Sequence, residues 1–205
     1  MKKKKKGLFI VFEGIDGSGK DCHINRLYEK LTGLGYDVIK TAEPWISEAG
    51  KRMRKLALEG RKDISPREEA RFYLEDRREH TGKIINPALS KGQIVLCGRY
   101  YYSTMAYQGA LGADPEEIRR ENESVVPIPD LVIMLRVDIE ENMRRIFKRS
   151  KQIAKGYEKQ DYLSKVGGIL YNINAPYIKQ IETSGDVEET AAKVYSTVKP
   201  YLENS

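Results

Sequence analysis

The chain has few of the residues that build disulfide frameworks and zinc sites, and it has no long apolar run. Its 205 residues include only 2 cysteines, Cys22 and Cys97. Two cysteines without a spaced partner pair argue against both a disulfide framework and a zinc site. No stretch approaches the roughly 20 apolar residues of a membrane helix, and the run 8–12 is too short for a signal-peptide core. We therefore expect a soluble, cytoplasmic protein with no membrane partner.

Charged residues are plentiful, but their signs are mixed. The 36 Lys and Arg residues against 30 Asp and Glu residues give a net charge of +6. Part of the excess lies in 2–6, which we expect to form a solvated basic tail over residues 1–6. The chain carries no aromatic–basic recognition motif, so nucleic acid is not an expected partner. A modest basic excess fits a site that holds several phosphates.

Short apolar runs alternate with longer amphipathic segments along the chain. Strands are predicted at 8–13, 37–41, 93–97 and 131–137. Helices are predicted at 20–33, 48–59, 66–80 with a continuation to 89, 139–149, 161–181 and 187–202. This alternation is typical of βαβ units with helices on both faces of a parallel sheet. We predict a three-layer α/β/α fold with a central parallel sheet, as one domain over residues 7–205.

A glycine-rich loop follows the first predicted strand and opens the first predicted helix. Its residues are Gly14, Ile15, Asp16, Gly17, Ser18, Gly19 and Lys20. Glycines let successive backbone N–H groups turn inward around a phosphate, and the helix N-terminus adds donors and a favourable dipole. Lys20 would place a positive charge on the β- and γ-phosphates of ATP. The context predicts the nucleotide-binding loop of a P-loop NTPase fold.

The position after Lys20 departs from the usual form of this loop. A Walker A motif continues with Ser or Thr, whose hydroxyl binds Mg²⁺, whereas this chain has Asp21. We predict that Asp21 belongs to the nucleotide-binding loop and is the candidate metal-binding residue.

Several segments beyond the loop together resemble the thymidylate kinases, a family of P-loop nucleoside monophosphate kinases. The similar segments are 12–20, 41–44, 76–80 with 84–89, 98–100, 103–109, 129–131 and 156–158. They follow the order of the family and reach from residue 9 to about residue 171. The resemblance implies transfer of the γ-phosphoryl group of ATP to thymidylate, with Mg²⁺ as cofactor, in a homodimer.

The resemblance assigns the sugar and phosphate of the acceptor to particular residues. Asp16 would accept a hydrogen bond from the 3′-hydroxyl of the sugar. Arg99 would bind the acceptor phosphate near the point of transfer, and with Lys20 and Asp16 it forms the expected catalytic set. Arg54 would be a second arginine for the same phosphate. A structural ion pair for Arg99 and a solvated helix charge for Arg54 remain the alternatives.

The resemblance assigns the thymine base to a second group of residues. Tyr73 and Arg77 lie four residues apart, on one face of a predicted helix. Tyr73 would stack on the thymine ring, and Arg77 would reach a base carbonyl. Ser103 and Thr104 would lie near the base edge and Tyr107 near the sugar. Ordinary core packing remains the alternative for Tyr73 and Tyr107.

A short lid is expected around residues 150–159, a polar stretch with several lysines. Arg149, Lys151 and Lys155 are its candidates for closing over the ATP phosphates. Solvated surface charges are the alternative for each of them.

The chain departs from the family pattern around the expected metal site. Asp21 replaces a hydroxyl residue, and Gly98 replaces an aspartate. In one hypothesis Asp21 supplies the carboxylate that Gly98 has lost. In the other, the changes leave a catalytically weak or repurposed nucleotide-binding homologue. A kinase for another nucleoside monophosphate is a third interpretation. On the acceptor side, Ala42 replaces an arginine of the pattern, and Trp45 and Arg136 also depart from it.

Overall fold

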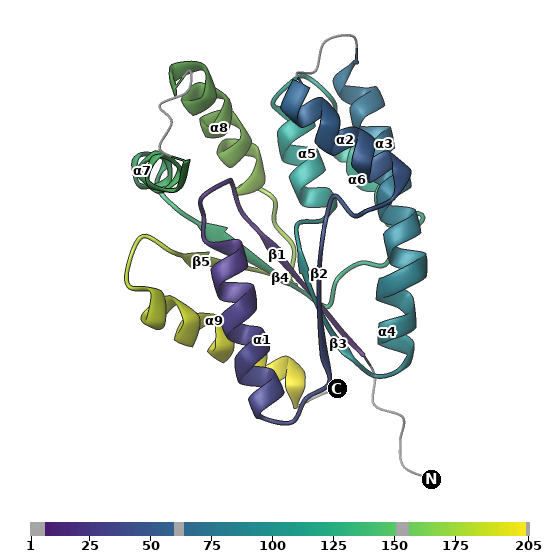
Figure 1. The fold of residues 1–205 in the computed structure, drawn as a ribbon, viewed down its shortest axis with the longest axis vertical. Coiled ribbons are helices and arrows are strands. Elements are labelled where there is room, and N and C mark those ends of the chain that lie inside the picture. Colours follow the sequence, from purple (N-terminus) through teal and green to yellow (C-terminus); the bar gives the residue numbers. More distant parts are fainter. Residues whose placement is uncertain (1–6, 60–63, 151–155, 204–205) are drawn as a thin grey trace.

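Five parallel strands form the central sheet of the chain (Figure 1). The computed structural model describes residues 7–59, 64–150 and 156–203. The strands are β1 Leu8–Glu13, β2 Val38–Ala42, β3 Ile94–Gly98, β4 Leu131–Arg136 and β5 Ile178–Glu182. Their order is β2-β3-β1-β4-β5, and every pairing is parallel. The predicted α/β class with a central parallel sheet is confirmed.

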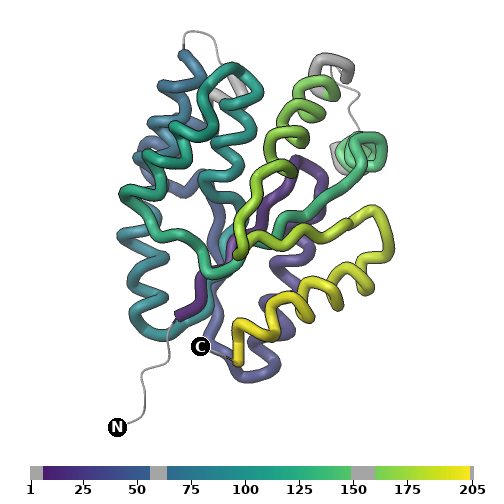
Figure 2. The backbone as a smooth tube through the Cα atoms, turned by 180° about the vertical axis from the view of Figure 1, so that it is seen from behind, coloured from purple at the N-terminus to yellow at the C-terminus, as the bar shows by residue number. Residues whose placement is uncertain are grey.

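Helices cover both faces of the sheet (Figures 1 and 2). They are α1 Lys20–Gly33, α2 Glu48–Glu59, α3 Pro66–His80, the π-helical turn η1 Thr81–Ile85, α4 Asn86–Ser90, α5 Tyr101–Gly109, α6 Pro115–Glu123, α7 Ile139–Ser150, α8 Gly156–Leu170 and α9 Val187–Leu202. Side chains of α1 and α9 pack on one face of the strands, and side chains of α5, α6 and α8 pack on the other. Alternate residues of β1 enter the two cores, as the two-residue period of a strand requires.

The strand and helix predictions succeed where local signals are strong. Each of the four predicted strands lies within one residue of its observed bounds at both ends. The start of α3 is also as expected, because Ser65 and Glu68 form a capping box and Pro66 occupies the first turn.

The predicted helix at 161–181 is wrong in its second half. Helix α8 ends at Leu170, and residues 178–182 form β5 beside β4. The segment 171–177 contains two asparagines and a proline, which favour turns over a continuous helix. Residues 178–182 become a strand because they pair with β4, and a local sequence pattern does not contain this long-range contact. Helices α5 and α6 were not predicted at all.

The loops that carry the expected site meet at one edge of the sheet. The carboxyl ends of β1, β2 and β3 lead into the glycine-rich loop, the segment 43–47 and Arg99 respectively. In open parallel sheets, ligands bind at this edge, where neighbouring loops diverge.

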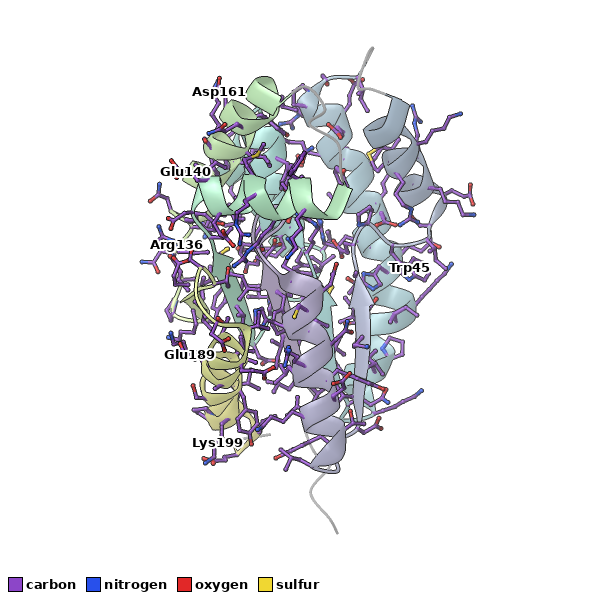
Figure 3. All side chains as sticks on the ribbon, turned by 60° about the vertical axis from the view of Figure 1, so that its left-hand side comes forward. Trp45, Arg136, Glu140, Asp161, Glu189 and Lys199 are labelled. Carbon is purple, nitrogen blue, oxygen red and sulfur yellow. The ribbon has the colours of Figure 1, made fainter. Side chains whose placement is uncertain are left out.

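Two of the departures from the family pattern lie away from each other. Figure 3 shows Trp45 and Arg136 at opposite edges of the view. Trp45 stacks on His80 with ring centroids 5.6 Å apart, and Arg136 lies at the exposed end of β4 with its guanidinium over Tyr171.

Among the residues that the structure describes, no helix has the length and apolar character to cross a membrane.

Candidate active site

The glycine-rich loop turns tightly between β1 and α1. Gly14 and Gly17 have φ values of 150° and 85°, and residues that carry a side chain rarely adopt such values. A Cβ atom at Gly14 would also lie 2.6 Å from the Leu135 carbonyl oxygen, and one at Gly17 would lie 2.8 Å from Asn142 Nδ2. Glycine is therefore required here by both the backbone and the available space.

Lys20 folds back onto the loop that precedes it. Its Nζ donates hydrogen bonds to the carbonyl oxygens of Gly14 at 2.8 Å and Ile15 at 2.9 Å. Burial, and next the neighbouring Arg99, lower the pKa of Lys20 to about 7. A phosphate placed beside this nitrogen would favour the charged ammonium form and would compete with the two carbonyls.

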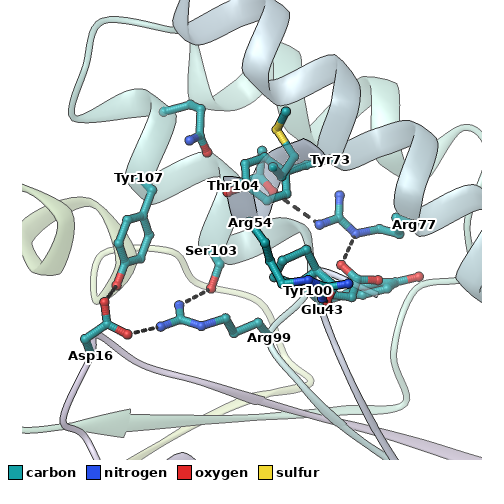
Figure 4. A pocket seen from close by; sticks show the side chains of 13 residues that line it. Asp16, Glu43, Arg54, Tyr73, Arg77, Arg99, Tyr100, Ser103, Thr104 and Tyr107 are labelled. Atoms are coloured by element: carbon teal, nitrogen blue, oxygen red, sulfur yellow. Dashed lines mark hydrogen bonds and ion pairs between the residues drawn. The ribbon is translucent and has the colours of Figure 1, made fainter. Parts of the chain in front are cut away.

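A cavity of ≈ 270 Å³ opens next to the loop, between α2, α3 and α5 (Figure 4). Its lining includes every residue that the resemblance assigned to the acceptor: Asp16, Arg54, Tyr73, Arg77, Arg99, Ser103, Thr104 and Tyr107. It also includes five residues that sequence reasoning did not assign: Glu43, Pro44, Met53, Tyr100 and Gln108. The structure thus brings together side chains from five different segments.

Arg99 dominates the end of the cavity nearest the loop. Its Nη2 pairs with Asp16, and its Nη1 donates to Ser103 Oγ at 3.0 Å. The Tyr107 hydroxyl donates to the second oxygen of Asp16 at 3.2 Å, and burial raises the pKa of this phenol. Figure 4 shows this chain of contacts along one wall. In a complex, Arg99 can pair with an anionic group of the ligand, and the released Asp16 carboxylate can accept a hydrogen bond from a sugar hydroxyl. This end of the cavity therefore suits an anionic ligand that carries a sugar.

Arg77 lies at the other end of the cavity and is almost fully buried. Its Nε donates to Glu43 Oε2 at 2.7 Å, Nη1 to Asn122 Oδ1 at 2.5 Å and Nη2 to Thr104 Oγ1 at 3.2 Å. A guanidinium has five N–H donors, so these three bonds leave capacity for a ligand. Tyr73 lies beside it on the same wall (Figure 4).

Gln108 is a candidate that the sequence reasoning missed. It lines the cavity and is 1% exposed, and within the described residues neither atom of its amide has a hydrogen-bond partner. A buried amide without partners costs about 1–3 kcal/mol, which a polar ligand would offset. Its position four residues after Thr104 on α5 is the signal that could have identified it.

Arg54 reaches the cavity wall but is bonded to the protein. Its guanidinium donates to the carbonyl oxygens of Pro44 at 2.5 Å and Trp45 at 2.6 Å. The Glu43–Pro44 peptide between β2 and α2 is cis. The role of Arg54 as a second phosphate-binding arginine stays a prediction.

A second cavity, of ≈ 420 Å³, lies on the α1 side of Arg99. Lys20, Asp21, Ala42, Gly98 and Arg145 are among its lining residues. Asp21 is exposed in the first turn of α1. Because Mg²⁺ keeps several waters and needs only one or two carboxylates, this donor set fits a hydrated Mg²⁺ ion bound to phosphates.

Ala42 and Gly98, which depart from the family pattern, are direct neighbours across the sheet. They are paired in the parallel register of β2 and β3, and a Cβ at Gly98 would lie 3.5 Å from that of Ala42. The same Cβ would lie 3.2 Å from Ile24 Cδ1. The two positions where the family pattern has an arginine and an aspartate therefore lie side by side in the sheet, and here both carry small uncharged residues.

The lid candidates cannot be placed. Lys151 and Lys155 lie outside the described residues, as does the side chain of Arg149.

Comparison with known proteins supports one family. The family model described as thymidylate kinase matches residues 12–194. The thymidylate kinase of Desulfotalea psychrophila is 41% identical over 196 residues, 96% of each chain. That of Akkermansia muciniphila is 40% identical over 191 residues, covering 93% of this chain and 91% of the relative.

A solved structure extends the likeness to three dimensions. The thymidylate kinase from Ehrlichia chaffeensis is 27% identical, with a TM-score of 0.75, and the match covers 94% of this chain and 99% of that one. Because the family model spans most of the sequence and relatives of at least 40% identity match it nearly end to end, the chain belongs to the thymidylate kinase family.

Proposed function

We propose that the chain phosphorylates thymidylate to thymidine diphosphate by holding the acceptor phosphate at Arg99 and the thymine at Arg77. The observation that carries this proposal is the lining of one cavity. It has a cation at the end facing the ATP loop and a buried hydrogen-bonding group at the other. A nucleotide has the same polarity, with a phosphate at one end and a base edge at the other.

At the phosphate end, the substrate would take over contacts that now join protein groups. The acceptor phosphate would replace Asp16 as the partner of Arg99, and the 3′-hydroxyl would donate to the released carboxylate. The Asp16 side chain is 51% exposed, so breaking this ion pair costs little. A guanidinium fork suits a phosphate and offsets the charge that develops during transfer.

At the base end, hydrogen bonds would select thymine. The Gln108 amide offers a donor group, Nε2, and an acceptor group, Oε1, which match a carbonyl oxygen and the N3–H group of thymine. Arg77 would donate to a base carbonyl, and Tyr73 would supply a ring face for stacking. Arg77 has only donors, so it can bind the 4-carbonyl oxygen of thymine but not the 4-amino group that cytosine carries in its place.

Replacing Gln108 by leucine tests the acceptor site. We expect KM for thymidylate to rise about tenfold with kcat little changed, because the lost contact acts equally in ground and transition states. The thermal midpoint should not fall, because the change removes a buried amide without protein partners. Steady-state kinetics with thymidylate, uridylate and deoxycytidylate provide the measurement, and an unchanged KM for thymidylate contradicts the assignment.

On the donor side, the glycine-rich loop and Lys20 would hold ATP. The Lys20 ammonium would leave the Gly14 and Ile15 carbonyls for the transferring phosphate. An acceptor phosphate is already anionic, so the reaction needs alignment and charge stabilisation rather than a strong general base. Magnesium bound to the triphosphate supplies further charge neutralisation, and Asp21 is the residue that would hold it.

Asp21→Asn separates the two interpretations of the altered metal site. If Asp21 holds the ion, we expect the Mg²⁺ concentration for half-maximal activity to rise about tenfold. Binding of Mn²⁺ with a non-hydrolysable ATP analogue, followed by electron paramagnetic resonance, should weaken in parallel. Asp21→Thr restores the hydroxyl of the Walker A motif and serves as the matched control. If Asp21 only repels the β-phosphate, the asparagine variant binds ATP more tightly and turns over faster.

The proposal also includes the setting in which the reaction occurs. Residues 7–205 would act as one kinase domain, and two copies would form a homodimer in the cytoplasm, as family membership supports. The lid at 150–159 stays a prediction, because residues 151–155 lie outside the described part of the chain.

A further inference from the structure

Glu13, the last residue of β1, is a buried carboxylate for which substrate binding offers no role. Its exposed fraction is 0%, so it lies behind the walls of the cavities. Burial raises its pKa, while the Ser103 hydroxyl and Arg99 hold the pKa down. A carboxylate in such a place needs hydrogen-bond donors around it.

Within the described part of the chain, the hydrogen-bond donors to the Glu13 carboxylate come from the start of α5. Glu13 Oε1 accepts from the backbone N–H groups of Tyr100 at 2.7 Å and Ser103 at 3.1 Å, and Oε2 accepts from Ser103 Oγ at 2.6 Å. Tyr100, the residue before α5, provides no side-chain cap for this helix. The Glu13 carboxylate, from a neighbouring strand, therefore accepts hydrogen bonds from the N–H groups that an N-cap side chain usually satisfies.

The same contacts lead directly to Arg99. Arg99 has φ 67°, the left-handed region, and among the described non-glycine residues no other has a positive φ. Its N–H donates to the Phe12 carbonyl at 2.9 Å, and the next N–H along the chain, that of Tyr100, donates to Glu13. These two bonds anchor both peptides of the strained residue in β1.

The head of the Arg99 side chain is fixed through the same carboxylate. Ser103 Oγ donates to Glu13 and accepts from Arg99 Nη1 at 3.0 Å. Because the hydroxyl hydrogen is committed to Glu13, a lone pair of Oγ is directed at the guanidinium. Glu13 thus orients both the backbone and the guanidinium of Arg99 without reaching the cavity.

We propose that Glu13 is a positioning residue for phosphoryl transfer, which sets the conformation of Arg99 through the Tyr100 N–H group and the Ser103 hydroxyl. The inference rests on the proposed role of Arg99. A displacement of about 1 Å at a transferring group lowers rates by up to about 100-fold, so the effect on turnover should exceed that of an ordinary helix cap.

Glu13→Gln is the main test, because the amide has nearly the same shape but cannot accept at both atoms. We expect kcat with thymidylate to fall about 30-fold, with KM for ATP unchanged. Asp114→Ala, which removes the side-chain cap of α6, is the matched control and should lower stability without this loss of kcat. Kinetics of Glu13→Gln within twofold of that control would overturn the inference.

Ser103 variants keep the test decisive if Glu13→Gln does not fold. Ser103→Ala should lower kcat, Ser103→Thr should recover most of it, and the double variant Glu13→Gln with Ser103→Ala should be no slower than Glu13→Gln alone. Independent losses that multiply in the double variant would contradict a shared route. Arg99→Ala separates failure of the proposed function from failure of the positioning role. If Arg99→Ala leaves kcat unchanged, the proposed function fails. If Arg99→Ala lowers kcat but Glu13→Gln and Ser103→Ala do not, only the positioning role of Glu13 fails.

Discussion

Replacing Arg99 by alanine is expected to lower kcat with thymidylate by roughly 1,000-fold. Arg99 is the guanidinium at the point where the cavity meets the ATP loop, between Asp16 and Ser103. A cation placed there stabilises charge on the transferring group more than it stabilises bound substrate, so the fall in kcat should exceed the rise in KM for thymidylate that follows from the lost phosphate contact. Single-turnover measurements with saturating ATP and thymidylate would isolate the chemical step.

Two further Arg99 variants control for charge and backbone strain. Arg99→Lys keeps the charge but loses the planar fork, so we expect about 100-fold loss of kcat. Arg99→Gly should be as slow as Arg99→Ala yet about 1 kcal/mol more stable, because glycine accepts the φ of 67° without strain. An alanine variant with kcat within threefold of the native chain would refute the role of Arg99.

Glu43→Ala is expected to destabilise the protein by about 3–5 kcal/mol. Glu43 Oε2 accepts from Arg77 Nε at 2.7 Å, and the two side chains are 3% and 1% exposed. Its other oxygen contacts His80 Nδ1 at 3.2 Å. Removing this carboxylate leaves a guanidinium buried without its counter-ion, and desolvation of that charge dominates the cost. Urea unfolding followed by circular dichroism gives the free energy directly.

A double variant shows whether the cost comes from the unpaired charge. Glu43→Leu combined with Arg77→Met replaces the ion pair by apolar side chains, and it should recover most of the stability. KM for thymidylate should rise in this variant, because Arg77 no longer donates to the base. A loss below about 1 kcal/mol for Glu43→Ala would mean that water or a shifted partner solvates Arg77.

The buried polar groups mark where prediction from the sequence ended. Tyr73, Arg77 and Arg99 were assigned from short motifs, and the structure places all three on one cavity. Gln108 and Glu13 were not assigned, because their roles depend on what surrounds them in space. A glutamine on an apolar helix and a glutamate at a strand end occur in many structural roles. Only the hydrogen-bond partners in the folded chain show that the Gln108 amide has none among the described residues and that Glu13 accepts from the start of α5.

Local signals in the sequence predict four of the five strands, the phosphate loop and the start of α3, because apolar runs, glycines and caps act within a few residues. Tertiary packing decided β5, since the segment 178–182 becomes a strand only by pairing with β4. It also decided that Ala42 and Gly98 form one neighbouring pair and that Glu13 caps α5. These contacts join residues far apart in the chain, and their energies depend on burial that no local pattern specifies.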